Sequence, residues 1–281
     1  MKSNIKLYTT SFKKVGSCTI DMLEEAIDNL YQVISCIYEI DNIYMDSSLY
    51  EQNIFDGKKL EEILYSPHPI IERDLQSRLR NIFEKIIFSE KEQPDAYLIF
   101  YSVANVIEEI HIHNIYEWRI FKRKHLEDCN FSKEDFVYIS KYIFPQLYFH
   151  ERNRETIDKI LVRYKKKIIK ALSILNDHLA ECITDVCTPK QITNKLNTFF
   201  PHDTDSSPES CSSRRNLCTF KFLNDKKQYE DICCELHIKI HSDDKNRIPT
   251  KNQPFARIYF NKGKTNIQNG KILIGHIGEH L

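Results

Sequence analysis

Three runs near the end of the chain decide its fold: YEDICCELHIKI at residues 229–240, FARIYF at 255–260 and KILIGHIG at 271–278. Apolar and polar residues alternate within them, as expected for strands that bury one face of a sheet. A fourth strand-like run, CTFKFL, precedes them at 218–223, and the connections between the runs are rich in turn formers. Neighbouring strands joined in this way usually pair antiparallel, so we predict a small antiparallel sheet here.

Most of the chain before this sheet has helical periodicity. The pattern predicts helices over 19–38, 59–65, 70–88, 95–123, 132–144 and 155–182, with an extended or turn-like stretch at 41–49. Ser132 is the expected N-cap of the fifth helix, with Asp135 at its third position. A Thr-Pro start at 188–189 predicts a short helix to residue 200.

The polar, Ser-rich stretch PHDTDSSPESCSSRRN at 201–216 is typical of a flexible loop. We therefore predict an α+β protein with a mainly helical N-terminal body over 1–187. The remainder, 188–281, is expected to form a C-terminal β-rich module with an antiparallel sheet.

Composition argues against several protein classes. No run approaches the ~18 apolar residues of a membrane span and the first residues do not form a signal peptide, so we expect a cytoplasmic protein with no membrane partner. Six glycines, with neither GxGxxG nor GxxxxGK[ST], argue against a nucleotide-binding α/β fold, and no cofactor is expected. Nine cysteines without CxxC spacing indicate neither a disulfide framework nor a zinc ribbon.

The net charge of zero conceals an uneven distribution. Residues 19–74 hold thirteen acids and three bases, whereas residues 119–170 hold fourteen bases and seven acids. The longest predicted helix has a basic stripe that is a candidate nucleic-acid-binding surface. Its members are Lys159, Arg163, Lys166, Lys167 and Lys170. The alternatives are an ordinary solvated helix face, or a surface that the acidic segment covers within the chain or across a homodimer.

Strand alternation collects titratable side chains on one face of the predicted sheet. Histidine, arginine and tyrosine are unusual choices for a merely wet face, although an antiparallel sheet normally has one polar side. The residues are Glu235, His237, Lys239, His241, Arg257, Tyr259 and His276, with His280 just beyond the last strand. The module from Cys218 onward has eleven bases and seven acids, which would attract a polyanion.

The strand ARIYF followed by KILIGHIGEHL resembles the C-terminal part of RelE/HigB/ParE-type toxins, and also uncharacterised bacterial proteins that end in a run like RIYF…ILIGHIGEHL. Several of those toxins are metal-independent RNA endonucleases. The resemblance implies a toxin-like or phage-defence effector whose sheet face binds and cleaves RNA. The residues that it assigns to catalysis are Lys239, Arg257, His276 and either Tyr259 or His280, and the chemistry of the sheet face adds His237.

The chemistry is coherent with those side chains. Cleavage by the RNA 2′-hydroxyl needs a base, a proton donor for the leaving oxygen and cations for the phosphate, and none of these has to be a metal. We expect His237 and His276 to transfer protons, and Arg257 and Lys239 to hold the phosphate. The rival hypothesis is a non-enzymatic binding subunit of a defence or toxin complex, which recognises protein or nucleic acid.

Three weaker motifs remain as alternatives. Glu235, His237 and His241 have the spacing of metal ligands on one strand face, and Glu235 to Lys239 approximates the Glu-x-Lys of PD-(D/E)xK nucleases. Arg119 followed by His125 matches the loose Arg-His spacing of HEPN ribonucleases. The neighbouring His111 and His113 are interpreted as a pair on a helix surface.

Overall fold

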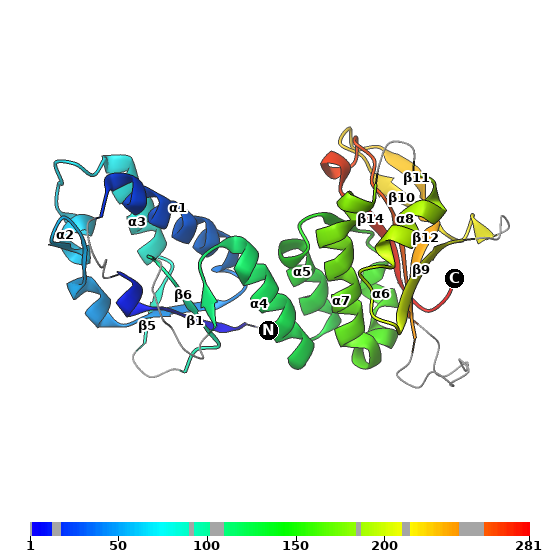
Figure 1. Cartoon of the computed structure of the whole chain (residues 1–281), viewed down its shortest axis with the longest axis horizontal. Helices are drawn as coiled ribbons and strands as arrows, with labels where there is room; N and C mark the ends of the chain where they lie inside the picture. Colours follow the sequence, from blue (N-terminus) through cyan, green and yellow to red (C-terminus); the bar gives the residue numbers. More distant parts are fainter. Residues whose placement is uncertain are drawn as a thin grey trace. The chain divides into compact units, whose positions relative to one another are not determined.

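The computed structural model describes residues 2–12, 18–89, 93–101, 110–183, 187–209, 214–241 and 256–281. The chain forms two compact units, Met1–His125 and Leu126–Leu281, shown in Figure 1. The α+β class is confirmed. The division falls at residue 125, whereas the sequence predicted a change of character near residue 187.

The N-terminal unit contains a five-stranded parallel sheet in the order β5-β2-β1-β6-β7. Its strands are β1 (Asn4–Leu7), β2 (Asn42–Met45), β5 (Ile87–Phe88), β6 (Ala96–Leu98) and β7 (His111–Ile112). The first strand, β1, is central; β2 and β5 follow on one side of it, and β6 and β7 are then added on the other side, as in doubly wound folds. The low glycine content therefore did not exclude a parallel α/β arrangement; β1 runs through Tyr8 into η1 (Thr9–Phe12) without a glycine turn.

The other elements of this unit are α1 (Ile20–Ile37), η2 (Ser47–Glu51), β3 (Asn53–Phe55), β4 (Lys58–Lys59), α2 (Leu60–Tyr65), α3 (Arg73–Phe83) and α4 (Ile115–Asp128). The side chain of Thr19 caps α1 by accepting a hydrogen bond from the Met22 amide. The buried face of α1 repeats at i, i+3, i+4 and i+7, as predicted. Its buried members are Leu23, Ala26, Ile27, Leu30, Val33, Ile34 and Ile37.

A buried polar cluster joins α4 to the amino end of the parallel sheet. Asp41 accepts hydrogen bonds from the Ser3 amide (2.8 Å) and from Trp118 Nε1 (2.9 Å), and it pairs with the ammonium of Lys122. The side chains of both ions are fully buried. Such a pair holds α4 in place because either charge alone would be costly in the interior.

The helix predicted over 95–123 is wrong for the described residues before Ile115, and its residues 102–109 lie outside the described part of the chain. Two short strands, β6 and β7, occupy its first part, and helix begins only at Ile115. Strands of a parallel sheet are buried on both faces and read as apolar runs, which periodicity does not distinguish from a buried helix. His111 is accordingly on β7, and His113 lies beyond the strand, where it contacts Glu117. Likewise, the helix predicted over 70–88 ends at Phe83, and β5 follows.

The C-terminal unit is a mixed five-stranded sheet in the order β8-β14-β13-β12-β9, with helices against one face (Figure 1). Its strands are β8 (Leu147–Phe149), β9 (Thr204–Pro208), β12 (Leu236–Ile240), β13 (Ala256–Asn261) and β14 (Ile272–Gly278). Its helices are α5 (Lys133–Ile143), α6 (Asn153–Thr156), α7 (Asp158–Cys182), α8 (Pro189–Leu196) and η4 (Gln268–Gly270). The capping box of Ser132 and Asp135 is present, as predicted.

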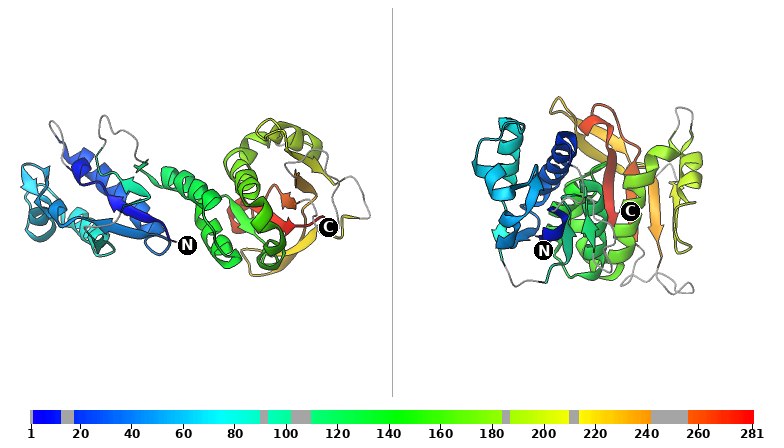
Figure 2. Two further views of the ribbon diagram at one scale, coloured as in Figure 1. Left: turned by 90° about the horizontal axis from the view of Figure 1, so that it is seen from below. Right: turned by 60° about the vertical axis from the view of Figure 1, so that its left-hand side comes forward.

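Most neighbours in this sheet are antiparallel, as expected, but β8 joins the edge of β14 in parallel. The long run 229–240 is two strands, and the first of them, β11 (Tyr229–Cys233), forms a hairpin with β10 (Thr219–Leu223). The predicted loop over 201–216 is wrong for Thr204–Pro208, which pair with β12. Figure 2 shows the sheet from another side, with β14 in red beside β13.

The two faces of this sheet have different covers. Helix α7 contacts β12 and β14 on one side. Buried residues such as Ile238 and Ile258 belong to this face, and the polar residues that alternate with them along the strands belong to the other. On the other side the hairpin forms an apolar cluster with Tyr259 and Leu273. This cluster contains Cys218, Phe220, Phe222, Ile232, Cys234, Tyr259, Ile267 and Leu273. The polar face is thus partly covered and is not simply solvent-exposed.

Among the described residues, none of the helices has the length and apolar character needed to cross a membrane.

Candidate functional site

A row of three aromatic side chains crosses β12, β13 and β14. The strand register places His237 opposite Tyr259, and Tyr259 opposite His276. The ring centroids of the first pair are 5.1 Å apart and those of the second pair 5.9 Å apart. The three side chains are enclosed, with exposed fractions of 5% for His237, 0% for Tyr259 and 3% for His276.

A β-bulge sets the position of His276. The register of β13 with β14 shifts between Tyr259 and Phe260, so that Leu273 and His276 lie on the same face, whereas simple alternation grouped Ile274 with His276. The bulge contains Gly275, where an added Cβ would come within 2.3 Å of the Phe220 ring. Glycine therefore permits the hairpin to lie close over this part of the sheet.

Arg257 lies beside the row, on the same face of β13 and opposite Lys239 of β12. We call His237, Arg257, Tyr259 and His276 the polar row. Lys239 is engaged elsewhere, since its ammonium lies 3.3 Å from Asp205 of β9. His241 contacts the same carboxylate at 2.9 Å.

The polar row has an unusual number of buried polar atoms without a hydrogen-bond partner. They are Nδ1 of His237, Nδ1 of His276, the hydroxyl of Tyr259, and Nε and Nη1 of Arg257. The Glu235 backbone lies near the His237 ring, but no hydrogen bond of good geometry joins it to Nδ1. The second ring nitrogens are occupied: Nε2 of His237 lies 3.3 Å from the Ser207 hydroxyl, and Nε2 of His276 lies 2.9 Å from the Glu279 carbonyl. Buried groups are nearly always paired, so five such atoms on neighbouring strands indicate a site for a ligand.

Burial fixes the protonation states of the row. It lowers the pKa of His237 to about 4, helped by the positive charges of Arg257 and Lys239. Burial also lowers the pKa of His276 to about 4, with a smaller effect of Arg152. Both imidazoles are therefore neutral at neutral pH.

The phenol and the guanidinium of the row are desolvated as well. Burial raises the pKa of Tyr259, so the phenol keeps its proton; the Leu281 backbone lies near enough to oppose this shift, but no hydrogen bond of good geometry joins it to the hydroxyl. Burial lowers the pKa of Arg257, but its guanidinium remains charged at neutral pH. The row thus presents two neutral bases, one weak acid and one cation.

His280 lies apart from the three enclosed rings. Its side chain is exposed, and Nε2 lies 3.2 Å from Nη1 of Arg214. Partial burial lowers its pKa, together with the charges of Arg257 and Arg214. His280 is therefore at the margin of the site and not in the row.

The basic stripe of α7 is partly neutralised by local acids. Lys166 lies 2.8 Å from Asp128, and Lys167 lies 2.5 Å from Asp203. The other three members, Lys159, Arg163 and Lys170, are exposed. The two ion pairs come from within the C-terminal unit, not from the acidic segment at 19–74.

The alternative motifs gain no geometric support. In the part of the chain that is described, no group of three or more His, Cys, Asp and Glu side chains has the arrangement to hold a metal ion. His241 is directed to Asp205, and His237 to Ser207. Arg119 and His125 are both on α4.

Sequence reasoning missed the contribution of β9 to this site. Asp205 and Ser207 contact polar side chains of β12, and the carboxylate of Glu209 opposes the lowering of the His237 pKa. The segment has no apolar alternation and many Ser and Pro residues, so its sequence resembles a loop. The one pattern that indicated a strand was the polar alternation of Thr204 and Ser206, which are both buried.

Comparisons with protein-family models, with curated proteins and with solved structures gave no match.

Proposed function

We propose that the C-terminal unit binds RNA and cleaves it at the polar row by attack of the 2′-hydroxyl. The observation that supports this most is the set of five unpartnered polar atoms, which belong to a base, an acid and a cation on adjacent strands. A phosphodiester with its neighbouring hydroxyl would supply acceptors and a donor for them. The resemblance to RelE/HigB/ParE-type toxins makes a toxin-like or phage-defence effector the expected setting.

The roles differ from those expected from the sequence alone. A neutral imidazole, His237 or His276, takes the 2′-hydroxyl proton while the oxygen bonds to phosphorus. The P–O5′ bond breaks, and the leaving oxygen takes the phenolic proton of Tyr259. The products are a 2′,3′-cyclic phosphate and a 5′-hydroxyl, and the imidazolium then returns a proton to the phenolate. Arg257 stabilises the charge on the pentacoordinate phosphorane.

Tyr259→Phe tests the proposal most sharply because it removes only the hydroxyl and keeps the ring that packs against the hairpin. Since that hydroxyl has no hydrogen-bond partner, the variant should be as stable as the wild type. The rate of RNA cleavage should fall by about 10²–10⁴, the usual contribution of a general acid. Cleavage should persist in EDTA, because each proposed role belongs to a side chain.

The wild type and the variant are purified identically, so that a contaminating nuclease would give equal rates. Equal rates, or intact RNA with the wild type at all protein concentrations, would exclude cleavage at this row. A His202→Gln variant, which changes an exposed histidine of the same unit, is the matched control and should cleave at the wild-type rate.

One observation favours a second candidate, RNA binding without cleavage. The Tyr259 side chain is fully buried, and an RNA atom reaches its hydroxyl only if the covering residues move. In that case the wild type binds RNA and releases it intact. We also propose that the protein acts in the cytoplasm, since all eight described cysteines are free thiols.

A further inference from the structure

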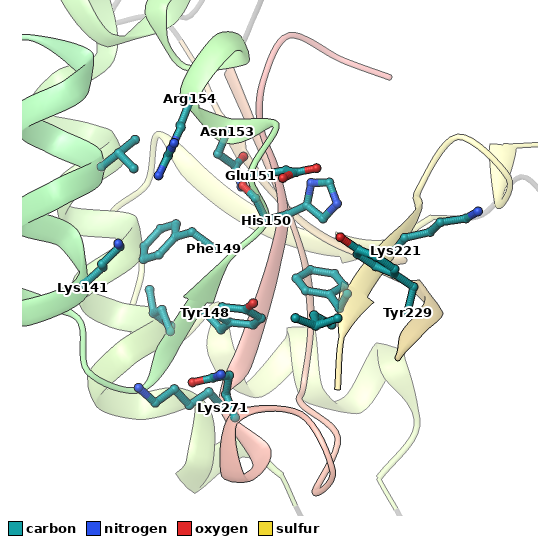
Figure 3. Close-up of a pocket in the computed structure, with 15 residues that line it drawn as sticks. Lys141, Tyr148, Phe149, His150, Glu151, Asn153, Arg154, Lys221, Tyr229 and Lys271 are labelled. Carbon is teal, nitrogen blue, oxygen red and sulfur yellow. The ribbon is translucent and has the colours of Figure 1, made fainter. Parts of the chain in front are cut away.

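A cavity of the C-terminal unit lies away from the polar row, and no sequence pattern indicated it. It has a volume of about 470 Å³, within the ~300–1,000 Å³ typical of ligand pockets. The end of α5, β8 and the start of α6 form one wall, and the hairpin β10–β11 forms the other (Figure 3).

Four cations from distant parts of the chain line this cleft, and Figure 3 shows the side chain of Lys221 directed outward from it. Lys141 belongs to α5, Arg154 to α6 and Lys221 to β10, while Lys271 immediately precedes β14. None of the four forms an ion pair with a described residue, whereas Lys166, Lys167 and Lys239 do. The lining contains one acid, Glu151. The cleft therefore has a net positive charge that the described residues of the unit do not compensate, which favours an anionic ligand.

Aromatic side chains supply the second property of the cleft. Tyr148 lies in its centre, with its ring 5.8 Å from that of Phe222 beneath the hairpin. Tyr229 extends from the opposite wall and is 70% exposed. His150 lies between the walls, 5.2 Å from Phe222, and burial lowers its pKa. Its Nδ1 accepts a hydrogen bond from the Arg152 amide (3.3 Å), so the ring is held in place as part of the wall.

Cations and accessible aromatic faces in one concave site match the chemistry of an unpaired nucleotide, whose base stacks and whose phosphates are anionic. An acidic peptide would use the cations and leave the rings without a planar partner. A duplex would present its stacked bases edge-on and would not enter a cavity of this size. We propose that this cleft binds an unpaired nucleotide of single-stranded RNA. The base lies against Tyr148 and Tyr229, and the flanking phosphates lie near Lys141, Arg154 and Lys271.

This proposal rests on the proposed RNA function but not on cleavage. The test is the affinity of the full chain for a short, fluorescently labelled 2′-O-methyl RNA strand, which lacks the attacking hydroxyl and stays intact. Tyr229→Ala should weaken binding at least fivefold, since stacking on one aromatic ring is worth about that factor or more. Its control is Tyr116→Ala, another exposed tyrosine, in the N-terminal unit.

The cations are tested by salt dependence. For the double variant Lys141→Gln and Arg154→Gln, the slope of log affinity against log salt should become shallower by about 1.4, because two phosphate contacts are lost. The control pair, Lys226→Gln with Lys227→Gln, changes exposed lysines in the hairpin turn outside the cleft and should leave the slope unchanged.

Each result decides between the two proposals. Wild-type affinity in both cleft variants, equal affinity for the matching duplex, or no binding of the strand at low salt would overturn the cleft proposal. Tyr259→Phe should bind the strand normally. If Tyr259→Phe loses cleavage and the cleft variants bind the strand normally, the proposed function is retained and the cleft proposal is rejected. If binding depends on the cleft but no cleavage occurs, the cleft proposal is retained and cleavage at the polar row is rejected.

Discussion

Acid should destabilise the C-terminal unit through the two buried imidazoles of the polar row. The pKa of His237 and of His276 is about 4 in the folded chain, against 6.5 for an unperturbed histidine. Between these values the unfolded chain binds more protons, so stability is complete above pH 6.5 and is lost as the pH falls towards 4. From pH 7 to pH 5 each imidazole should remove about 2 kcal/mol from the free energy of unfolding.

The perturbation that tests this reasoning is His276→Gln, which keeps a polar side chain of comparable reach and removes the titration. Hydrogen exchange of peptides from β12 to β14, followed by mass spectrometry, measures the opening free energy of this sheet at each pH. The variant should lose about 2 kcal/mol less than the wild type between pH 7 and pH 5. The exposed His202→Gln should behave like the wild type.

The N-terminal unit provides an internal reference. The single tryptophan, Trp118, belongs to it, so urea unfolding followed by fluorescence reports that unit alone. Its pH dependence should be the same in wild type and variant. If His276→Gln and the wild type lose equal stability on acidification, the imidazole is accessible to protons in the native state and the assigned burial is wrong.

Two further predictions concern buried contacts. Lys122→Met should lower the stability of the N-terminal unit by about 3–5 kcal/mol, because Asp41 would keep its buried charge without a cation. The urea midpoint of Trp118 fluorescence measures this loss of stability, and an unchanged midpoint contradicts the pairing. Gly275→Ala should destabilise the C-terminal unit by about 1–3 kcal/mol and expose Cys234 to thiol reagents, since the new methyl would meet Phe220 at 2.3 Å. Adding Phe220→Leu should recover part of the loss.

Local patterns in the sequence were enough for helices such as α1 and α5 and for the polar face of the C-terminal sheet. The capping box of Ser132 and the apolar stripe of α1 involve residues within one or two turns of each other, so their chemistry is visible in the sequence. Period-two alternation similarly grouped His237 and Arg257, because a strand places alternate side chains on one face whatever its neighbours are.

Tertiary structure decided what those side chains can do. Strand alternation placed Tyr259 and His276 on one polar face and gave no sign of its cover. The hairpin β10–β11 packs against Tyr259 only in the folded chain, and burial shifts the pKa values of both Tyr259 and His276. The bulge at Gly275, which brings His276 opposite Tyr259, depends on pairing between strands and has no signature in either strand alone.

The parallel sheet of the N-terminal unit and the cleft were also beyond local reasoning. Short strands such as Ala96–Leu98 carry too few residues to show a period, and they are recognisable only by their partners across the sheet. The cations of the cleft lie far apart in the sequence, between Lys141 and Lys271. The sequence therefore determined the regular helices and the faces of the longer strands. Which faces meet, and which charges remain without a partner among the described residues, is fixed by long-range packing.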